Sequence, residues 1–112
     1  MLVGYLQMSE FFIKLDTISV KGKTEGVDIY TILEPKNIRL AREMRDNIHS
    51  KMLWHYSRQE WETAARECDA LKGAFDGQLD YYYAMMCNRI NEYMNDESFP
   101  KDWNGTYVAK TK

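Results

Sequence analysis

Two lysines on either side of a glycine are the residues of this sequence best suited to bind an anion. Lys21 and Lys23 flank Gly22 in a short connection between two runs of residues that favour β-strands. In such a turn, backbone amides and the two ammonium groups can face a common anion such as a triphosphate. A Lys-Gly-Lys turn is more often just the solvated tip of a hairpin. The residues alone therefore favour a solvated tip, with an anion site as the alternative.

Other residues with catalytic or metal-binding side chains form no recognisable motif. His49 and His55 are six positions apart, which is not the one-turn spacing of paired metal ligands on a helix. Ser57 and Cys68 have no identifiable base partner. Five aspartates are scattered over a strand, helix faces and a cap, where solvated or capping roles are the commoner ones: Asp16, Asp28, Asp69, Asp76 and Asp80. The sequence therefore predicts no catalytic residue, no metal site and no cofactor.

A β-hairpin within residues 1–34 must position the lysines. Thr, Ile, Val and Tyr on both sides of the turn favour pleated, half-buried strands. Gly22 and Gly26 supply the backbone freedom that a short connection requires. Apolar residues occur on both faces of each predicted strand. We expect one face to pack on the rest of the chain, and the other face and the open edges to pair with a second copy.

Helices are predicted after the hairpin, because the hydrophobic period changes from two to about 3.6 at Pro35. The first helix should run from Pro35 to about Tyr56. Ser57 followed by Glu60 matches a capping box, in which the two side chains satisfy free amides at a helix start. The second helix should therefore begin near Arg58.

The third predicted helix follows Gly73, which should end the second, and Asp76, which should cap the third. The three helices resemble a tetratricopeptide helix pair followed by the first helix of the next repeat, through the following order of residues: Tyr56, Gln59, Trp61, Ala64, Leu71 and Asp76. We therefore predict a mainly α fold. It comprises a β-hairpin segment, 1–34, and a three-helix tetratricopeptide-like α-α array with an extended aromatic tail, 35–112. Phe99, Trp103 and Tyr107 of the tail should cover faces that so short an array leaves open.

The turn and the end of the chain resemble a class III nucleotide cyclase. Residues 15–30 read LDTISVKGKTEGVDIY. This is similar to the Val-Lys-Gly-Lys hairpin that closes the catalytic domain of that family, with its preceding Leu-Asp and a Tyr in the following strand. Residues 100–108 read PKDWNGTYV. This is similar to the element that ends bacterial cyclases with a helical C-terminal extension.

The resemblance implies that Lys21 contacts the nucleotide phosphates in a parent cyclase, with Lys23 as a possible accessory. The metal-binding aspartates and the transition-state Asn and Arg of that family lie upstream of the hairpin, and none can be assigned here. We expect this chain to be the non-catalytic C-terminal end of a class III cyclase, in the first place an adenylate cyclase. It would not be an enzyme by itself, and its helical part would serve protein interaction, regulation or dimerisation. The alternative is a free-standing tetratricopeptide-like protein-binding module unrelated to cyclic nucleotide synthesis.

Composition narrows the choice of partner. The 112 residues carry a net charge of −2 with both signs interspersed, which argues against nucleic acid and against an anionic lipid surface. No apolar run reaches membrane-spanning length and no secretory signal pattern is present, so we expect a cytoplasmic chain without membrane contact from this segment. Cys68 and Cys87 fall in apolar stripes and should be buried free thiols. The expected partner is a protein or a second protomer, and we expect a homo-oligomer.

Overall fold

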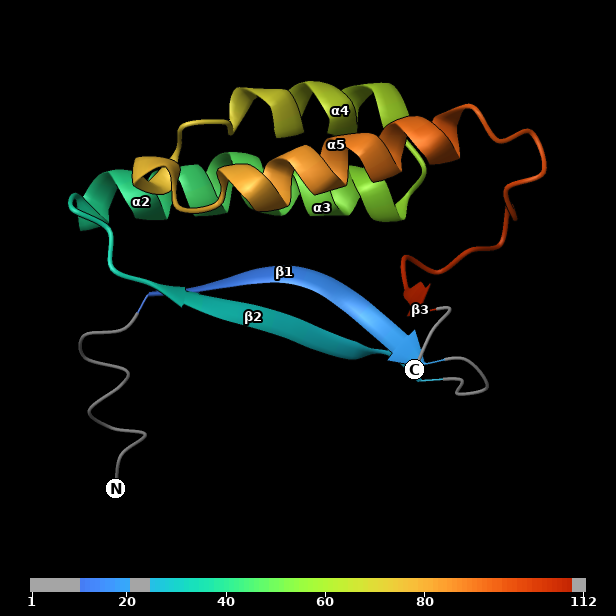
Figure 1. The fold of residues 1–112 in the computed structure, drawn as a ribbon, viewed down its shortest axis with the longest axis horizontal. Helices are drawn as coiled ribbons and strands as arrows, with labels where there is room; N and C mark the ends of the chain where they lie inside the picture. The colour runs from blue at the N-terminus through green and yellow to red at the C-terminus, as the bar shows by residue number, and fades with distance from the viewer. Residues whose placement is uncertain (1–10, 21–24, 110–112) are drawn as a thin grey trace.

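The residues on either side of the lysine turn form the expected antiparallel hairpin (Figure 1). β1 spans Phe11–Val20 and β2 spans Val27–Leu33, where β-branched and aromatic residues favour an extended backbone. The computed structural model describes residues 11–20 and 25–109, so the candidate contacts Lys21 and Lys23 lie outside the described residues. The strands that flank this turn are both defined.

A third strand, β3, comes from the tail and spans Tyr107–Ala109. It pairs in parallel with residues 18–20 of β1, which gives a mixed sheet in the order β2-β1-β3. With its helices, this sheet makes the chain a small α/β domain, so the prediction of a mainly α fold with an extended tail is wrong. The local pattern could not predict β3, because its three residues are held by pairing with a segment near the start of the chain.

The first helix is continuous but has three parts. α2 (Ile38–Met44) leads into a π-helical turn, η1 (Arg45–His49), and then into α3 (Ser50–Ser57). Asn37 caps the start, because its side chain accepts a hydrogen bond from a backbone amide of the first turn. The helix therefore begins later than the predicted Pro35 but ends close to the predicted position.

Two further helices, α4 (Trp61–Ala70) and α5 (Asp80–Met94), complete the helical layer. The predicted capping box does not form, because the Ser57 hydroxyl donates to a carbonyl of α3 and α4 begins only at Trp61. Gly73 follows α4 with a φ of +87°, which agrees with its predicted role as the residue that ends the helix.

The connection between α4 and α5 contains a short 3-10 turn, η2 (Phe75–Gly77). Asp76 lies in this turn, with a φ of +58°, and accepts a hydrogen bond from the backbone amide of Lys36. Asp76 therefore ties the connection to the start of the first helix instead of capping α5 as predicted.

The helices lie on one face of the sheet, with α3 and α5 next to it and α4 beyond them, and the predicted tetratricopeptide-like array is also wrong (Figure 1). α4 packs against both α3 and α5. Apolar side chains from the two layers form one core, whose buried members are the following: Phe11, Ile13, Leu33, Ala41, Met52, Tyr56, Ala64, Cys68, Leu71, Phe75, Leu79, Tyr83, Met86 and Ile90. The apolar helix stripes were expected. They pack on one another and, in addition, on Phe11, Ile13 and Leu33 of the sheet. The segments 1–34 and 35–112 thus share one core.

Aromatic side chains dock the tail onto the helices. The centroid of the Phe99 ring lies 4.4 Å from that of Tyr93 and 5.4 Å from that of Trp61. We call this group the tail cluster, which comprises Tyr56, Trp61, Tyr93, Phe99 and Trp103. The predicted docking of Phe99 and Trp103 is confirmed, whereas the third tail aromatic, Tyr107, lies in β3.

The helices also bear on two other expectations. None of the helices in residues 25–109 is long and apolar enough to cross a membrane. Cys68 of α4 is buried and Cys87 of α5 is half-buried, and both are free thiols. The cysteines therefore contribute to packing, as predicted from their places in apolar stripes.

Candidate functional site

A β-bulge turns a carboxylate of β1 toward the helices. The register with β2 shifts between Lys14, which pairs with Tyr30, and Asp16, which pairs with Ile29. The extra residue, Leu15, changes the alternation of faces along the strand. The side chain of Asp16 is therefore only 6% exposed, although Asp16 was expected to be solvated.

Asp16 forms an ion pair with Arg89 of α5. Nη1 of Arg89 donates to Oδ2 of Asp16 over 2.7 Å and to the hydroxyl of Tyr56 over 3.1 Å. The guanidinium carbon also lies 3.9 Å from the centre of the Tyr107 ring. Burial opposes the charge on Arg89, but interactions with Tyr56 and Asp16 outweigh it and raise the pKa of Arg89. The ion pair and its contacts thus join β1, α3, α5 and β3.

Backbone carbonyls of β1 bind further side chains from the helices. Nη1 of Arg45 donates to the carbonyl of Phe12 over 3.0 Å, and Nε2 of His49 donates to the carbonyl of Lys14 over 2.6 Å. The hydroxyl of Tyr82 donates to the carbonyl of the bulge residue, Leu15. These bonds satisfy three carbonyl groups of β1, and β3 pairs with β1 at residues 18–20.

His49 is buried in its neutral form, with its proton on Nε2. Because the carbonyl of Lys14 can only accept, Nε2 must carry the hydrogen. Nδ1 then accepts a hydrogen bond from the hydroxyl of Tyr83 over 2.7 Å. Burial lowers the pKa of His49, more than the bond to Lys14 raises it. His49 is therefore a packing residue.

The side chains around the bulge act as a single structural unit. We call them the bulge network, which comprises Asp16, His49, Tyr56, Tyr82, Tyr83 and Arg89. Burial raises the pKa of each of the three tyrosines, so their hydroxyls stay protonated. In residues 11–20 and 25–109, every buried side-chain nitrogen or oxygen has a hydrogen-bond partner. The network therefore holds β1 against the helices and presents no unpaired buried base or nucleophile.

A groove of about 610 Å³ opens above this network, between the hairpin and α3. Asp16, His49 and Tyr56 of the bulge network line it, as do Tyr30 from β2 and Trp54 from α3. Tyr30 and Trp54 are largely exposed, so the groove has aromatic walls and a polar floor. Its shape suits an interaction surface better than an enclosed reaction site.

The tail closes one end of the groove through Gly105. This residue has a φ of +90°, which favours glycine. A Cβ atom at this position would lie 2.9 Å from Cβ of Ser57 at the end of α3. The close approach of the tail to α3 therefore requires the glycine of the Asn-Gly-Thr sequence.

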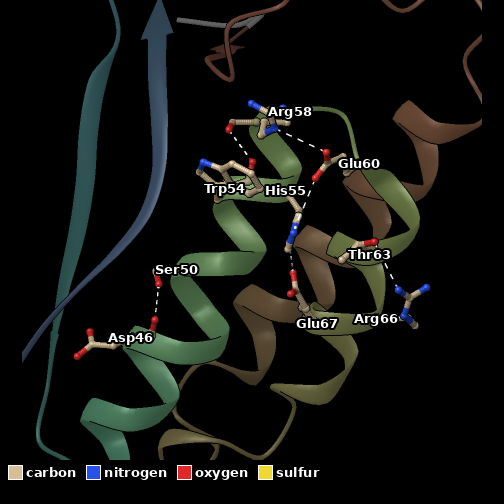
Figure 2. Close-up of polar contacts among 10 residues, drawn as sticks. Asp46, Ser50, Trp54, His55, Arg58, Glu60, Thr63, Arg66 and Glu67 are labelled. Carbon is tan, nitrogen blue, oxygen red and sulfur yellow. Dashed lines mark hydrogen bonds and ion pairs between the residues drawn. The ribbon is translucent and has the colours of Figure 1, made fainter.

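The other candidate polar residues lie apart from the bulge network. His55 points from α3 toward α4, with its ring nitrogens 2.8 Å from Glu67 and 3.7 Å from Glu60 (Figure 2). Asp28 is exposed and pairs with Lys14 and Thr17. The remaining predicted aspartates bind local partners, which are Lys72 for Asp69, the amide of Lys36 for Asp76 and the amide of Gly73 for Asp80. Within the described ranges, no three His, Cys, Asp or Glu side chains are grouped so that they could hold a metal ion.

Sequence reasoning missed the Asp16–Arg89 pair, although a signal was present. Asp16 interrupts a run of β-formers, and Arg89 stands beside Ile90 on the apolar stripe of its helix. A charged residue inside an apolar stripe of each element is the pattern that a buried pair produces. The pairing of these two residues across the chain could not be read from their separate positions.

Comparisons with known proteins add no assignment to this site. Models of protein families, curated proteins and solved structures all gave no match to the chain. The assignment of function therefore depends on the two sequence elements and on the geometry around the bulge.

Proposed function

We propose that this chain is the non-catalytic C-terminal module of a class III nucleotide cyclase, in the first place an adenylate cyclase. Its hairpin would supply Lys21 to the nucleotide phosphates, and its helices and tail would regulate that contact. The two sequence elements that resemble the family support this proposal, since they adjoin in one sheet. The first element, residues 15–30, includes the end of β1, and the tail element includes the start of β3, which pairs with the end of β1.

The observation that carries the regulatory role is the bulge network. His49, Tyr82 and Arg89 bind β1 directly, and β1 ends at Val20, which directly precedes Lys21 in the sequence. A displacement of α5 relative to the sheet would move Arg89 and Tyr82, and these bonds would carry the displacement into the strand. Coupling between two sites requires such a contiguous mechanical connection or an equivalent equilibrium between two states. The helical part would thus act on the nucleotide contact without catalytic residues of its own.

The partner surface is the outer edge of β2, and we assign it to a second copy of this chain. β2 is the terminal strand of the described sheet, and several of its apolar side chains are exposed: Val27, Ile29, Tyr30 and Ile32. Antiparallel pairing of two β2 strands about Tyr30 would set Asp28, the only charged residue of β2, opposite Ile32. No like charges would then face each other across the interface. We place this homo-oligomer in the cytoplasm, where nucleoside triphosphates are available.

A chimeric cyclase tests the proposal. The last hairpin and extension of an active class III catalytic domain are replaced by residues 11–112 of this chain. We expect the chimera to form cyclic AMP from ATP, and we expect Lys21→Ala to raise its KM for ATP about tenfold or more by removing a phosphate contact. Lys72→Ala, which removes a surface lysine of the helical part, is the matched control and should leave KM unchanged.

Two outcomes would contradict the proposal. One is an inactive chimera whose hairpin is folded, while the same domain with its own hairpin remains active. The other is an active chimera in which Lys21→Ala changes neither KM nor kcat. Either result would favour the alternative of a free-standing protein-interaction module. The isolated chain, with or without ATP and metal ions, should form no cyclic nucleotide.

A further inference from the structure

The two cysteines of the chain meet where α4 packs against α5. Sγ of Cys68 in α4 donates a hydrogen bond to the backbone carbonyl of Tyr83 over 3.2 Å. Because Tyr83 lies one helical turn before Cys87 in α5, this bond places the sulfur of Cys68 beside Cys87. The two thiols also interact directly with each other. Two thiols that are far apart in the sequence are thus neighbours in the folded chain.

The two thiols differ in their access to solvent. Cys68 is fully buried, whereas Cys87 is half-buried. Burial raises the pKa of the Cys68 thiol, and the neighbouring Cys87 raises it further, so this sulfur stays protonated. An oxidant from solvent therefore reaches Cys87 first, and Cys68 lies directly behind it.

A positive charge lies beside the accessible thiol. The pKa of Lys72 is raised by its hydrogen bond with Asp69 and, next in size, by the charge of a Cys87 thiolate. The same attraction favours the thiolate over the thiol, and the thiolate is the form of cysteine that reacts with oxidants. The surroundings of the pair thus combine an accessible sulfur, a nearby cation and a second thiol within reach.

The packing of the helices suits a covalent bond between the two sulfurs. Because a cysteine side chain is short, the hydrogen bond from Cys68 to a carbonyl of α5 requires a close approach of the two helices. In a disulfide, the sulfurs lie about 2.05 Å apart and the Cα atoms usually about 4.4 to 6.8 Å apart. Rotation of two side chains that already interact can bring the sulfurs to bonding distance.

We propose that Cys68 and Cys87 are a reversible disulfide site, which a hydroperoxide closes and which locks α4 onto α5. This inference goes beyond the proposed function and does not depend on it. The Cys87 thiolate attacks one oxygen of the hydroperoxide and becomes a sulfenic acid, while the O–O bond breaks and the other oxygen takes up a proton and leaves as water or an alcohol. The sulfenic acid then reacts with the Cys68 thiol, which forms the S–S bond and releases water. Two thiols are thereby oxidised to one disulfide, and the hydroperoxide is reduced.

The disulfide would restrain the helix that carries most of the bulge network. Tyr82, Tyr83 and Arg89 all belong to α5, and they bind β1 or the side chain of His49. A cross-link between α4 and α5 limits the freedom of the unfolded chain and so stabilises the folded one. Oxidation would therefore hold these contacts more firmly, and exchange with small thiols would release them again.

Stoichiometric hydrogen peroxide, added to the purified chain, tests the site. Mass spectrometry of the denatured product should show a monomer that has lost the mass of two hydrogen atoms, and a peptide map should join the Cys68 peptide to the Cys87 peptide. Dithiothreitol should restore the original mass. The oxidised chain should melt about 5 °C or more above the reduced chain. Cys68→Ala treated in the same way is the control and should show no such rise.

Two alanine variants, checked for folding by circular dichroism, separate the roles of the cysteines. In Cys68→Ala, the sulfenic acid of Cys87 has no second thiol, so dimedone should label it. In Cys87→Ala, the buried Cys68 should react with peroxide about tenfold more slowly than Cys87 does. Equal rates would overturn the assignment of Cys87 as the attacking thiol.

Three results with the unchanged chain would overturn the disulfide site itself. One is oxidation of Cys87 to a sulfinic acid while Cys68 remains a free thiol. The second is a disulfide between two chains instead of within one. The third is a disulfide that forms within the chain but leaves the melting temperature unchanged, because α4 would then not be locked onto α5. Each result is obtained without nucleotide, so it leaves the proposed function untouched.

Discussion

The two edges of the sheet have opposite surroundings. The edge of β1 is bound by Arg45, His49 and Tyr82 from the helices and then by β3. The edge of β2 ends the described sheet and exposes Tyr30 and other apolar side chains. An open strand edge offers backbone groups to another strand, whereas a bound edge cannot accept one. The difference indicates that β1 connects the sheet to its own helices, and that β2 is the edge available to another chain.

Two ion pairs that involve β1 differ in exposure, as the two edges of the sheet do. Asp16 and Arg89 are 6% and 11% exposed and lie 2.7 Å apart on the helical side. Lys14 and Asp28 are 37% and 49% exposed and lie 3.3 Å apart on the hairpin. Desolvation makes the loss of one partner costly in the first pair and unimportant in the second. The loss of one charged partner should therefore lower stability on the helical side of the bulge and leave it nearly unchanged on the hairpin side.

The largest loss of unfolding free energy is expected for the variant Arg89→Met. It would leave the Asp16 carboxylate buried without its counter-charge, which costs about 3 to 5 kcal/mol of unfolding free energy. In a domain of this size, that loss removes much of the total stability. Chemical denaturation followed by circular dichroism measures it. Lys14→Met is the matched control and should leave the denaturation midpoint unchanged, and equal losses in the two variants would refute the division between the pairs.

A smaller loss of stability is expected when the pH is lowered, because His49 is buried in its neutral form. Since burial lowers the pKa of His49 below its unfolded value of about 6.5, the unfolded chain binds the proton more readily. Its contribution to stability is therefore complete above about pH 6.5 and is lost as the pH falls toward the folded pKa, by up to about 1.4 kcal/mol for each pH unit. Thermal melts between pH 5 and 7 measure the slope.

Variants of the two histidines identify the source of that slope. His49→Gln should flatten it, because no buried imidazole remains to be protonated. His55→Gln should retain it, because this variant removes the contact with Glu67 and leaves the buried imidazole of His49 in place (Figure 2). A slope that disappears with His55 and persists without His49 would be inconsistent with a neutral His49 beneath β1.

The smallest effect on stability is expected at the open edge. Ile32→Glu replaces an exposed side chain of β2, so the unfolding free energy should change by less than about 0.5 kcal/mol. It should nevertheless weaken self-association by about tenfold or more, because the glutamate would face Asp28 of the second copy, and like charges directly opposite each other destabilise strand pairing. Sedimentation velocity over a concentration series measures the dimer. Ile32→Val is the control, and equal association of the two variants would place the interface elsewhere.

Local features of the fold could be predicted, whereas long-range ones could not. The alternation around Gly22 predicted the hairpin, and the apolar stripes predicted three helices with a stop at Gly73. The caps were wrong because Ser57 and Asp76 each bind other backbone groups. The class of the fold was wrong because β3 depends on pairing with a distant strand and on the aromatic packing of Trp103. Neither of these interactions produces a regular spacing of residues from which it could be predicted.

The candidate site shows the same limit. The lysine turn is a local motif and could be recognised, although Lys21 itself lies outside the described residues. The bulge network joins residues from β1, η1, α3 and α5, so its members come together only in the folded chain. Asp16 in particular was predicted to be solvated. It is buried instead, because the extra residue Leu15 in the strand changes the face to which Asp16 belongs. A one-residue shift of this kind is invisible to an alternation pattern.

Amide hydrogen exchange at two protein concentrations tests the difference between the edges most directly. We predict that residues 12–20 of β1 are protected equally at low micromolar and at millimolar concentration, since their partners belong to the same chain. The amides of β2 that do not pair with β1 should exchange freely at the low concentration and become protected at the high one. Protection of both edges that does not depend on concentration, in a chain that stays monomeric, would contradict an open β2. Rapid exchange along β1 would contradict its attachment to the helices.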